Sequence, residues 1–321
     1  MKKLYPLLLI SLVTLASCKK NTKEETPAAE TLPVVIPIAP DDNAGIGDTL
    51  LTGIFFDTFR VDLDETKWEK LNQVWGVSSV SAYIHGGVIK ENAFTRDGKA
   101  VLRALGDTYS GSLRGANGQA KRLGGVIKTK QRFASGKYEV RMKVLQAADM
   151  GVLSAAWTFF YKELTEAGDP VAYQKAVGKG NIPVNGKVIL NHEIDIEIKG
   201  ANLDYPLFTN WIGEAGPEHV SQGIKTQRFD DNAYHIFRWD WHTGGGGQQA
   251  VVNYYIDGQL ITSSNTRVPY RASYFSVGNW FAWWAGNDSG TYKSPNFNTK
   301  EMLVDWVKIT PFNEANDDWQ L

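Results

Sequence analysis

The chain contains one cysteine, Cys18, so it cannot form an intrachain disulfide bond. Its stability must therefore come from a hydrophobic core. Histidine is also scarce, with five residues whose spacing matches no metal-ligand motif. No Ser-His-Asp order stands out, and the run Gly244–Gly247 lacks the following helix that a phosphate-binding loop needs. These absences argue against a catalytic metal, a serine triad and a nucleotide cofactor.

An excess of charge of one sign is missing as well. The 34 lysine and arginine residues nearly balance 35 aspartate and glutamate residues, which gives a formal charge of −1. Removal of a leader that carries Lys2 and Lys3 would change this charge to −3. Such small values argue against nucleic acid or an anionic membrane surface as a partner.

The N-terminus resembles an export signal. Met1-Lys2-Lys3 is basic, the apolar run from Leu4 to Ala16 is short for a transmembrane helix, and Leu15-Ala16-Ser17-Cys18 resembles a bacterial lipobox. We therefore expect residues 1–17 to be a signal peptide and Cys18 to be lipidated. The protein would be an exported, membrane-anchored lipoprotein on the periplasmic or the cell-surface side, and residues 18–50, rich in Thr, Pro, Glu and Ala, would form a flexible tether.

Helical periodicity and internal repeats are nearly absent from the rest of the chain, about 265 residues that suffice for one large core. Asp257-Gly258 predicts a two-residue hairpin, and Gly244–Gly247 predicts a wider turn between two pairing strands. We predict an all-β domain over residues 51–314, built as a two-sheet antiparallel β-sandwich with a concave face, and a tail over 315–321. The predicted strands are Val126–Lys130, Lys137–Leu145, Leu153–Tyr161, Glu193–Lys199, Leu207–Ile212, Tyr234–His242, Gln249–Ile256, Gln259–Ser263, Ser273–Ala282 and Glu301–Thr310.

Residues 162–190 interrupt this pattern. A short helix is expected near Val171–Val177, followed by a turn region rich in Gly, Asn and Pro. The segment precedes the strand Glu193–Lys199, so it either walls one end of a cleft or is a passive surface excursion.

The most informative stretch is Glu193-Ile194-Asp195-Ile196-Glu197, in which carboxylates and isoleucines alternate strictly. In an extended strand the isoleucines would face a core and the three acids would line the opposite face. The Cα atoms of the two glutamates would lie roughly 13 Å apart. On a concave sheet their carboxyl groups could approach to about 5–6 Å, the separation typical of retaining glycosidases.

Three acids on one face cannot all ionise at low free-energy cost, so at least one should keep its proton near neutral pH. That suits a reaction in which one ionised carboxylate attacks an anomeric carbon and a protonated one serves the leaving oxygen. The alternation alone leaves two other interpretations open, a solvated acidic face and a cation site. Three extended alternate positions do not wrap an ion well.

His192–Glu197 resembles the signature of glycoside hydrolase family 16, in the form without an extra residue between Asp195 and Glu197. The resemblance spans about residues 51–314 in the family's order. It implies a jelly-roll fold, with Glu193 as nucleophile, Asp195 as its helper and Glu197 as general acid/base. It also allows a structural calcium ion and implies no catalytic cofactor. The other segments that carry it are Gly136–Lys143, Gly151–Trp157, Tyr254–Gly258 and Asp305–Lys308.

The chain has 11 tryptophans, more than a core of this size needs, and their faces can stack on sugar rings. Most of them should still be core residues, including Trp68, Trp75 and Trp306. The residues predicted to bind substrate are Trp157, Asn210, Trp211, Asn279, Trp283 and Trp284, of which Trp157 and Asn279 rest on the family resemblance.

Ile198-Lys199-Gly200 departs from the Phe-Leu-Gly that usually follows the motif in mixed-linkage glucanases of this family. Lys199 shares the acidic face by parity, where it would lower the pKa of Glu197 or contact an anionic sugar.

We therefore expect a monomeric, retaining endo-glycosidase acting on a β-linked polysaccharide, with β-1,3-1,4-glucan as first substrate because the motif resembles the lichenase and xyloglucan-active branch. The alternatives are a transglycosylase, a hydrolase of xyloglucan, laminarin or a charged galactan, and a non-catalytic glycan-binding lipoprotein. An intact acid triad speaks against the last of these.

Overall fold

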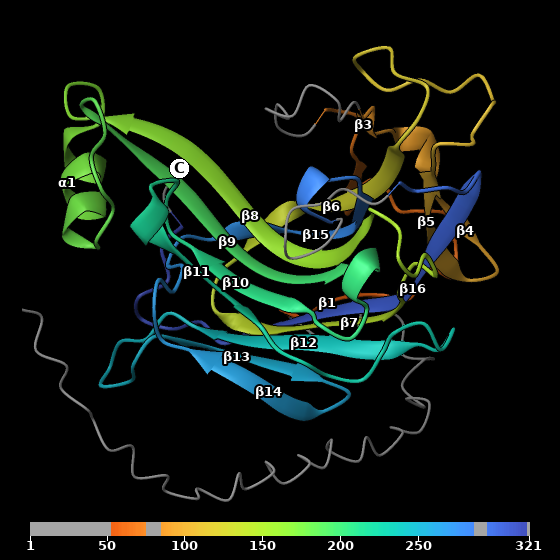
Figure 1. The fold of residues 1–321 in the computed structure, drawn as a ribbon. Coiled ribbons are helices and arrows are strands. Elements are labelled where there is room, and N and C mark those ends of the chain that lie inside the picture. The colour runs from red at the N-terminus through yellow and green to blue at the C-terminus, as the bar shows by residue number, and fades with distance from the viewer. Residues whose placement is uncertain (1–52, 75–84, 286–293, 320–321) are drawn as a thin grey trace, which may run out of the picture. The chain divides into compact units, whose positions relative to one another are not determined.

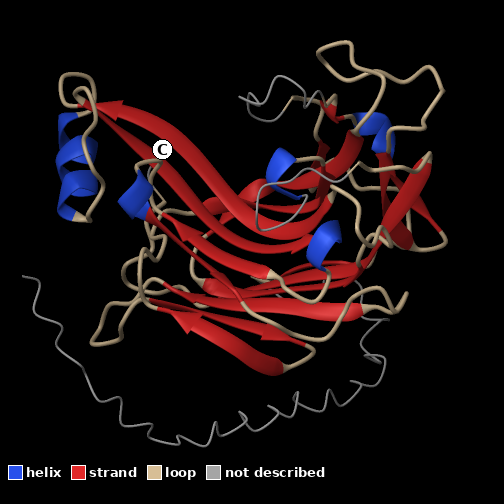
Figure 2. Cartoon of the chain, viewed as in Figure 1, coloured by secondary structure: helices blue, strands red, loops and turns tan. Residues whose placement is uncertain are grey.

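The computed structural model describes residues 53–74, 85–285 and 294–319, and the regular secondary structure in this part of the chain is almost entirely β-strand. Figure 2 shows strands throughout, with one α-helix at the margin and a few short 3-10 turns. The strands are β1 (Phe55–Asp57), β2 (Trp68–Lys70), β3 (Gly87–Val88), β4 (Ala93–Arg96), β5 (Lys99–Leu105), β6 (Leu123–Phe133), β7 (Gly136–Lys143), β8 (Leu153–Thr165), β9 (Lys187–Lys199), β10 (Leu207–Trp211), β11 (His219–Gly223), β12 (His235–His242), β13 (Val251–Ile256), β14 (Gln259–Ser264), β15 (Ser273–Trp280) and β16 (Thr299–Pro311); the helix is α1 (Pro170–Gly178).

The strands form two layers, as predicted for an antiparallel sandwich of the jelly-roll type. One layer follows the order β11-β10-β9-β8-β15-β6 and the other the order β5-β16-β7-β12-β13-β14. The layers join where Leu105 of β5 pairs with Leu123 of β6. Figure 1 shows β8, β9 and β10 curving over the layer that contains β7, β12 and β13.

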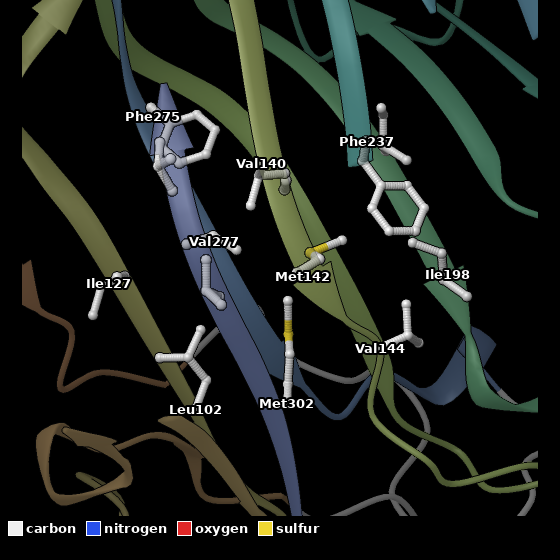
Figure 3. Close-up of a cluster of buried hydrophobic side chains, with 14 of the residues drawn as sticks. Leu102, Ile127, Val140, Met142, Val144, Ile198, Phe237, Phe275, Val277 and Met302 are labelled. Carbon is white, nitrogen blue, oxygen red and sulfur yellow. The ribbon is translucent and has the colours of Figure 1, made fainter. Parts of the chain in front are cut away.

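The core fills the space between the layers. Apolar side chains from alternate positions of both sheets meet there, because successive residues of a strand point to opposite faces. Figure 3 shows Phe275 and Val277 of β15 beside Val140 and Met142 of β7, with Met302 of β16 below Met142 in the view. Full burial of one large apolar side chain in this core stabilises the fold by about 1.5–3 kcal/mol relative to leaving that side chain exposed.

Each predicted strand is present, and the hairpin at Asp257-Gly258 joins β13 to β14 with both turn residues at positive φ. The wider glycine turn joins β12 to β13, which pair as expected. The short strands β1 to β5 and β11 were not predicted. Two to seven residues long, they form through pairing with other strands more than through a pattern of their own.

The largest correction concerns the segment 162–190. β8 continues to Thr165 and β9 begins at Lys187, so the hairpin is longer than predicted. The predicted helix is confirmed as α1, which packs on one face of that extension. Its residues Tyr173 and Ala176 bury Leu164, Val188 and Leu190.

Two other predictions can be compared with burial. Trp68 and Trp306 are buried, as expected, whereas Trp75 lies outside the described residues. The C-terminal tail is docked on the domain as far as residue 319, since Asp317 accepts a hydrogen bond from Ser135 and Asp318 pairs with Arg271.

None of the helices found in residues 53–74, 85–285 and 294–319 has the length and apolar character to cross a membrane.

Candidate active site

The three acids of the motif lie in a row on one face of β9, and the isoleucines between them are fully buried on the other face. Ile194, Ile196 and Ile198 belong to the main core. Glu193 and Glu197 are half-buried, while Asp195 between them is buried. The predicted division of β9 into an acidic face and an apolar face is therefore confirmed.

Neighbouring strands supply aromatic side chains to the acidic face. In the antiparallel pairing Phe159 of β8 and Trp211 of β10 are both opposite Glu193, and Trp157 is opposite Asp195. Directly paired residues share a face of the sheet. Glu193 is thus flanked by an aromatic residue on each side, an arrangement that the sequence indicated for Trp211 but not for Phe159.

Hydrogen bonds link the acids to one another and to their neighbours. Asp195 and Glu193 share one, the Asn191 side chain donates to Glu193, and the Trp211 side chain donates to Asp195. Asn191 was not predicted as a site residue. The sequence could have indicated it, because Asn191 stands two residues before Glu193 and therefore lies on the same face of the strand.

Burial raises the pKa of all three acids. It raises the pKa of Glu193 to about 7, against the hydrogen bonds from Asp195 and Asn191, which favour the ionised form. The pKa of Asp195 is raised well above its ordinary value by burial and by the charges of Glu193 and Glu197. Burial and the charge of Glu193 raise the pKa of Glu197 to about 8, and the nearby Lys199 lowers it. The row therefore holds protons at neutral pH. The sequence predicted this outcome from the crowding of like charges, whereas burial is the larger cause for all three acids and the only one that raises the pKa of Glu193.

His192 lies on the buried face behind the acids. Its Nδ1 accepts a hydrogen bond from the backbone N–H of Tyr270, and its ring meets the Tyr270 ring edge-on at 4.4 Å between centroids. Burial, followed by the charge of Arg271, lowers the pKa of His192 to about 3. The imidazole is therefore neutral at physiological pH and packs beneath the site.

Trp157 occupies the predicted strand position but has little surface for a sugar. Its side chain is 4% exposed, because it packs with Leu71, Val88 and Val126. The Trp280 ring lies 5.1 Å from it and is half-buried. Trp280, the last residue of β15, pairs with Leu153 of β8 and was not predicted as a site residue.

Three other predicted substrate ligands are buried away from solvent. Asn210 donates to the Thr266 carbonyl and accepts from the Tyr254 hydroxyl, and Asn279 donates to the Leu102 carbonyl of the opposite sheet. Lys199 is 3% exposed. Strand position explains the burial of the two asparagines. Asn210 pairs with the core-facing Ile194, and Asn279 lies two residues after the core residue Val277, on the same face of β15. The structure therefore does not support direct contact of these side chains with substrate.

The tryptophan pair at the end of β15 is only partly described. Trp284 is half-buried and packs against Leu153 and Ala282. The side chain of Trp283 lies outside the described part of the structure. In the described ranges, no three His, Cys, Asp or Glu side chains are grouped so that they could hold a metal ion.

No protein-family model matches the chain. It is 27% identical over 173 residues to a beta-glucanase of Bacillus amyloliquefaciens, covering 54% of this chain and 58% of that protein. It is 24% identical over 190 residues to a beta-glucanase of Bacillus licheniformis, covering 58% and 62%. The chain thus spans about three fifths of the length of the curated relatives it matches.

Solved structures are similar over most of the described chain. A beta-1,3-1,4-glucanase (lichenase) derived from a mouse hindgut metagenome has a TM-score of 0.56 at 20% identity, covering 81% of this chain and 99% of that one. The laminarinase catalytic domain from Thermotoga maritima has a TM-score of 0.56 at 17% identity, covering 81% and 98%. These structures share the jelly-roll fold of this chain.

Proposed function

We propose that this protein is a retaining endo-glycosidase of the glycoside hydrolase family 16 type that hydrolyses a β-glucan. The observation that carries the proposal is the row of three acids, Glu193, Asp195 and Glu197, on one face of β9. These acids keep protons at neutral pH, and Phe159 and Trp211 flank Glu193. The sequence similarity to two beta-glucanases supports hydrolysis of a β-glucan, and the shared fold of the lichenase and laminarinase structures is consistent with that family.

In the proposed first step the Glu193 carboxylate attacks the anomeric carbon of the sugar. A bond forms between that carbon and the Glu193 oxygen, and the glycosidic bond breaks as Glu197 gives its proton to the leaving oxygen. In the second step Glu197 removes a proton from water, the water oxygen bonds to the anomeric carbon, and Glu193 leaves as a carboxylate. Two displacements at one carbon retain its β configuration.

The pKa directions agree with these roles. Glu197, with a pKa raised to about 8, keeps its proton at neutral pH and can act as an acid. Asp195, whose pKa burial and the two flanking acids raise well above its ordinary value, stays protonated and can donate to Glu193. That hydrogen bond, together with the one from Asn191, favours the ionised form of Glu193 that the attack needs.

We favour a neutral glucan, with mixed-linkage β-1,3-1,4-glucan as the first candidate. Lys199 is the cation closest in sequence to the acids, and its burial argues against a charge pair with a sulfate or carboxylate on the substrate. Laminarin, xyloglucan and transfer of the glycosyl group to a second sugar are alternatives that use the same acids. A non-catalytic glycan-binding protein would not need the proton-holding Glu197.

We also propose that the protein is exported, lipidated at Cys18 and tethered to a membrane by residues 18–50. Cys18 and the tether lie outside the described residues, so this proposal is supported by the sequence pattern alone.

The direct experiment is to incubate soluble protein lacking the first 40 or so residues with mixed-linkage glucan, laminarin, xyloglucan, agar and carrageenan. New reducing ends on mixed-linkage glucan or laminarin would support the proposal. Activity confined to agar or carrageenan would contradict the glucan assignment, and glycan binding with no new reducing ends on any of the five would contradict the enzymatic one.

A further inference from the structure

A cavity of about 590 Å³ lies beside the end of β9 that is farther from Glu197. This volume falls within the range of about 300–1,000 Å³ typical of small-molecule sites. Ile189 in its wall shares the acidic face of β9 with Glu193, four residues away, which places the two Cα atoms roughly 13 Å apart. The cavity is lined by Ile182, Val184, Asn185, Lys187 and Ile189 on one side and by Glu214, Ala215 and Glu218 on the other.

The two walls come from segments far apart in sequence and are joined by one buried carboxylate. Glu218, in the connection between β10 and β11, accepts hydrogen bonds from the backbone N–H of Ile182 at 2.9 Å and from the Asn181 side chain at 3.1 Å. Its other oxygen accepts from the backbone N–H of Ala215 at 2.8 Å. Because Glu218 is buried and fully engaged, it holds both walls in place without a ligand.

Tyr161 of β8 links this cavity to the acids. It pairs with Asn191, while its neighbour on the same face, Phe159, pairs with Glu193. The two aromatic rings are stacked, with centroids 6.4 Å apart and planes 19° apart. Tyr161 is nevertheless 47% exposed, and its hydroxyl donates to Glu214 in the cavity wall. An aromatic surface therefore runs from beside the nucleophile to the edge of the cavity.

The lining has the mixed chemistry that a sugar ring needs. Ile182, Val184 and Ile189 offer apolar surface to C–H groups. Lys187, which pairs with Glu163 at 2.7 Å, and Glu214 offer a donor and acceptors to hydroxyl groups. The cation and the carboxylates offset one another, so the cavity favours a polar, uncharged ligand over an ion or a fully apolar one.

We propose that this cavity binds a carbohydrate unit remote from the cleaved bond, with Tyr161 as its stacking platform. The unit is either a distal sugar of the main chain or a side branch, since the same chemistry would recognise both. This inference rests on the proposed function, because it takes the acid row as the point of cleavage. The segment 162–190 would then form one wall of an extended substrate site.

The test fills the cavity with Ala215→Trp and uses Val171→Trp, on the outer side of α1 and 82% exposed, as the matched control. Both are made in a Glu193→Gln background, so that dissociation constants can be measured without turnover. The probes are linear gluco-oligosaccharides of increasing length and a branched β-glucan oligosaccharide of the same size. We expect Ala215→Trp to weaken binding of the probe that reaches the cavity about tenfold, or ~1.4 kcal/mol, and to leave short probes unchanged.

A second pair of variants tests the platform. Tyr161→Ala should weaken the same probe, whereas Tyr161→Phe should retain most of the affinity because the ring remains. A loss of affinity that begins at one length of the linear probe identifies the bound unit as part of the main chain. A loss of affinity confined to the branched probe identifies it as a side branch. Either result supports the proposal. Equal affinities of Ala215→Trp and Val171→Trp for every probe would overturn it, while turnover by the wild type would leave the proposed function standing. Failure of the wild-type sequence to bind or cleave any probe would overturn both.

Discussion

Trp211 lies directly opposite Glu193 in the pairing of β9 with β10, yet its side chain donates a hydrogen bond to Asp195. One residue therefore lies beside the proposed nucleophile in the sheet and contacts its proposed helper. This donor favours the ionised form of Asp195, whereas burial and the flanking acids favour the protonated form and prevail. The balance leaves Asp195 able to donate to Glu193.

The proposed role of Glu193 as nucleophile predicts that Glu193→Gln will lower kcat on a cleavable glucan by roughly a thousandfold or more. The amide cannot form the covalent glycosyl intermediate, but its size and position are those of the carboxyl group, so oligosaccharide affinity should change little. Turnover and binding are measured on the same preparation, with Glu166→Gln, an exposed carboxyl hydrogen-bonded to Gln174, as the control. Appreciable activity in the absence of deamidation would show that another residue is the nucleophile.

The proposed role of Glu197 as general acid/base predicts a separate phenotype for Glu197→Ala. With an activated aryl leaving group, formation of the glycosyl intermediate needs no acid, whereas polysaccharide cleavage should fall by about 10²–10⁴-fold. Added azide should then resolve the intermediate and give a β-glycosyl azide. The configuration of that product is read by NMR, and an α product would contradict the retaining mechanism.

Lys199 provides a test through pH dependence. Its charge lowers the pKa of Glu197, so Lys199→Met, which keeps the buried stem, should raise that pKa further above about 8. The proposed mechanism requires protonated Glu197, so the alkaline limb of the kcat/KM profile should move to higher pH. On neutral glucan the maximum should stay within about threefold of the wild type. A strong, salt-sensitive loss on carrageenan, with no activity on mixed-linkage glucan, would instead indicate an anionic substrate.

The acids should also lower the stability of the fold at neutral pH. Unfolded Glu197 loses its proton near its ordinary pKa of 4.5, whereas the folded protein keeps that proton to about pH 8. Between these values the folded state binds more protons than the unfolded state, so stability falls as pH rises. Glu197→Gln removes this effect and should increase the free energy of unfolding at pH 8 by about 1–2 kcal/mol, with little change at pH 4. Urea titrations at both pH values measure it, and an equal gain at pH 4 would point to packing instead.

The anchor proposal predicts that Cys18→Ala will abolish lipidation, because the change removes the thiol to which the lipid would be attached. The variant should leave the membrane fraction or accumulate unprocessed. Fractionation and mass spectrometry of the N-terminus measure both effects, with Ser17→Ala as a control that keeps the thiol. A Cys18→Ala protein that is both fully processed and membrane-bound would contradict lipidation at this residue.

The sequence by itself determined the architecture and the placement of the three acids on one face of a strand, because both depend on local patterns. Alternation in β9 is a property of consecutive residues, so it assigned the isoleucines to the core and the three acids to the opposite face before any neighbour was known. The Asp257-Gly258 turn is equally local, since its two residues adopt the positive φ that the hairpin needs.

Only the tertiary structure decided which side chains around the acids can reach a substrate. Exposure of a strand residue depends on register and on what covers each face, and both come from segments distant in sequence. The strand register makes Asn210 and Asn279 face the core. Trp157 is covered by Leu71, Val88 and Val126, and Lys199 is buried, so neither side chain is accessible to a substrate. The cavity beside Tyr161 exists because Glu218 joins two loops more than thirty residues apart, a contact that no local pattern encodes.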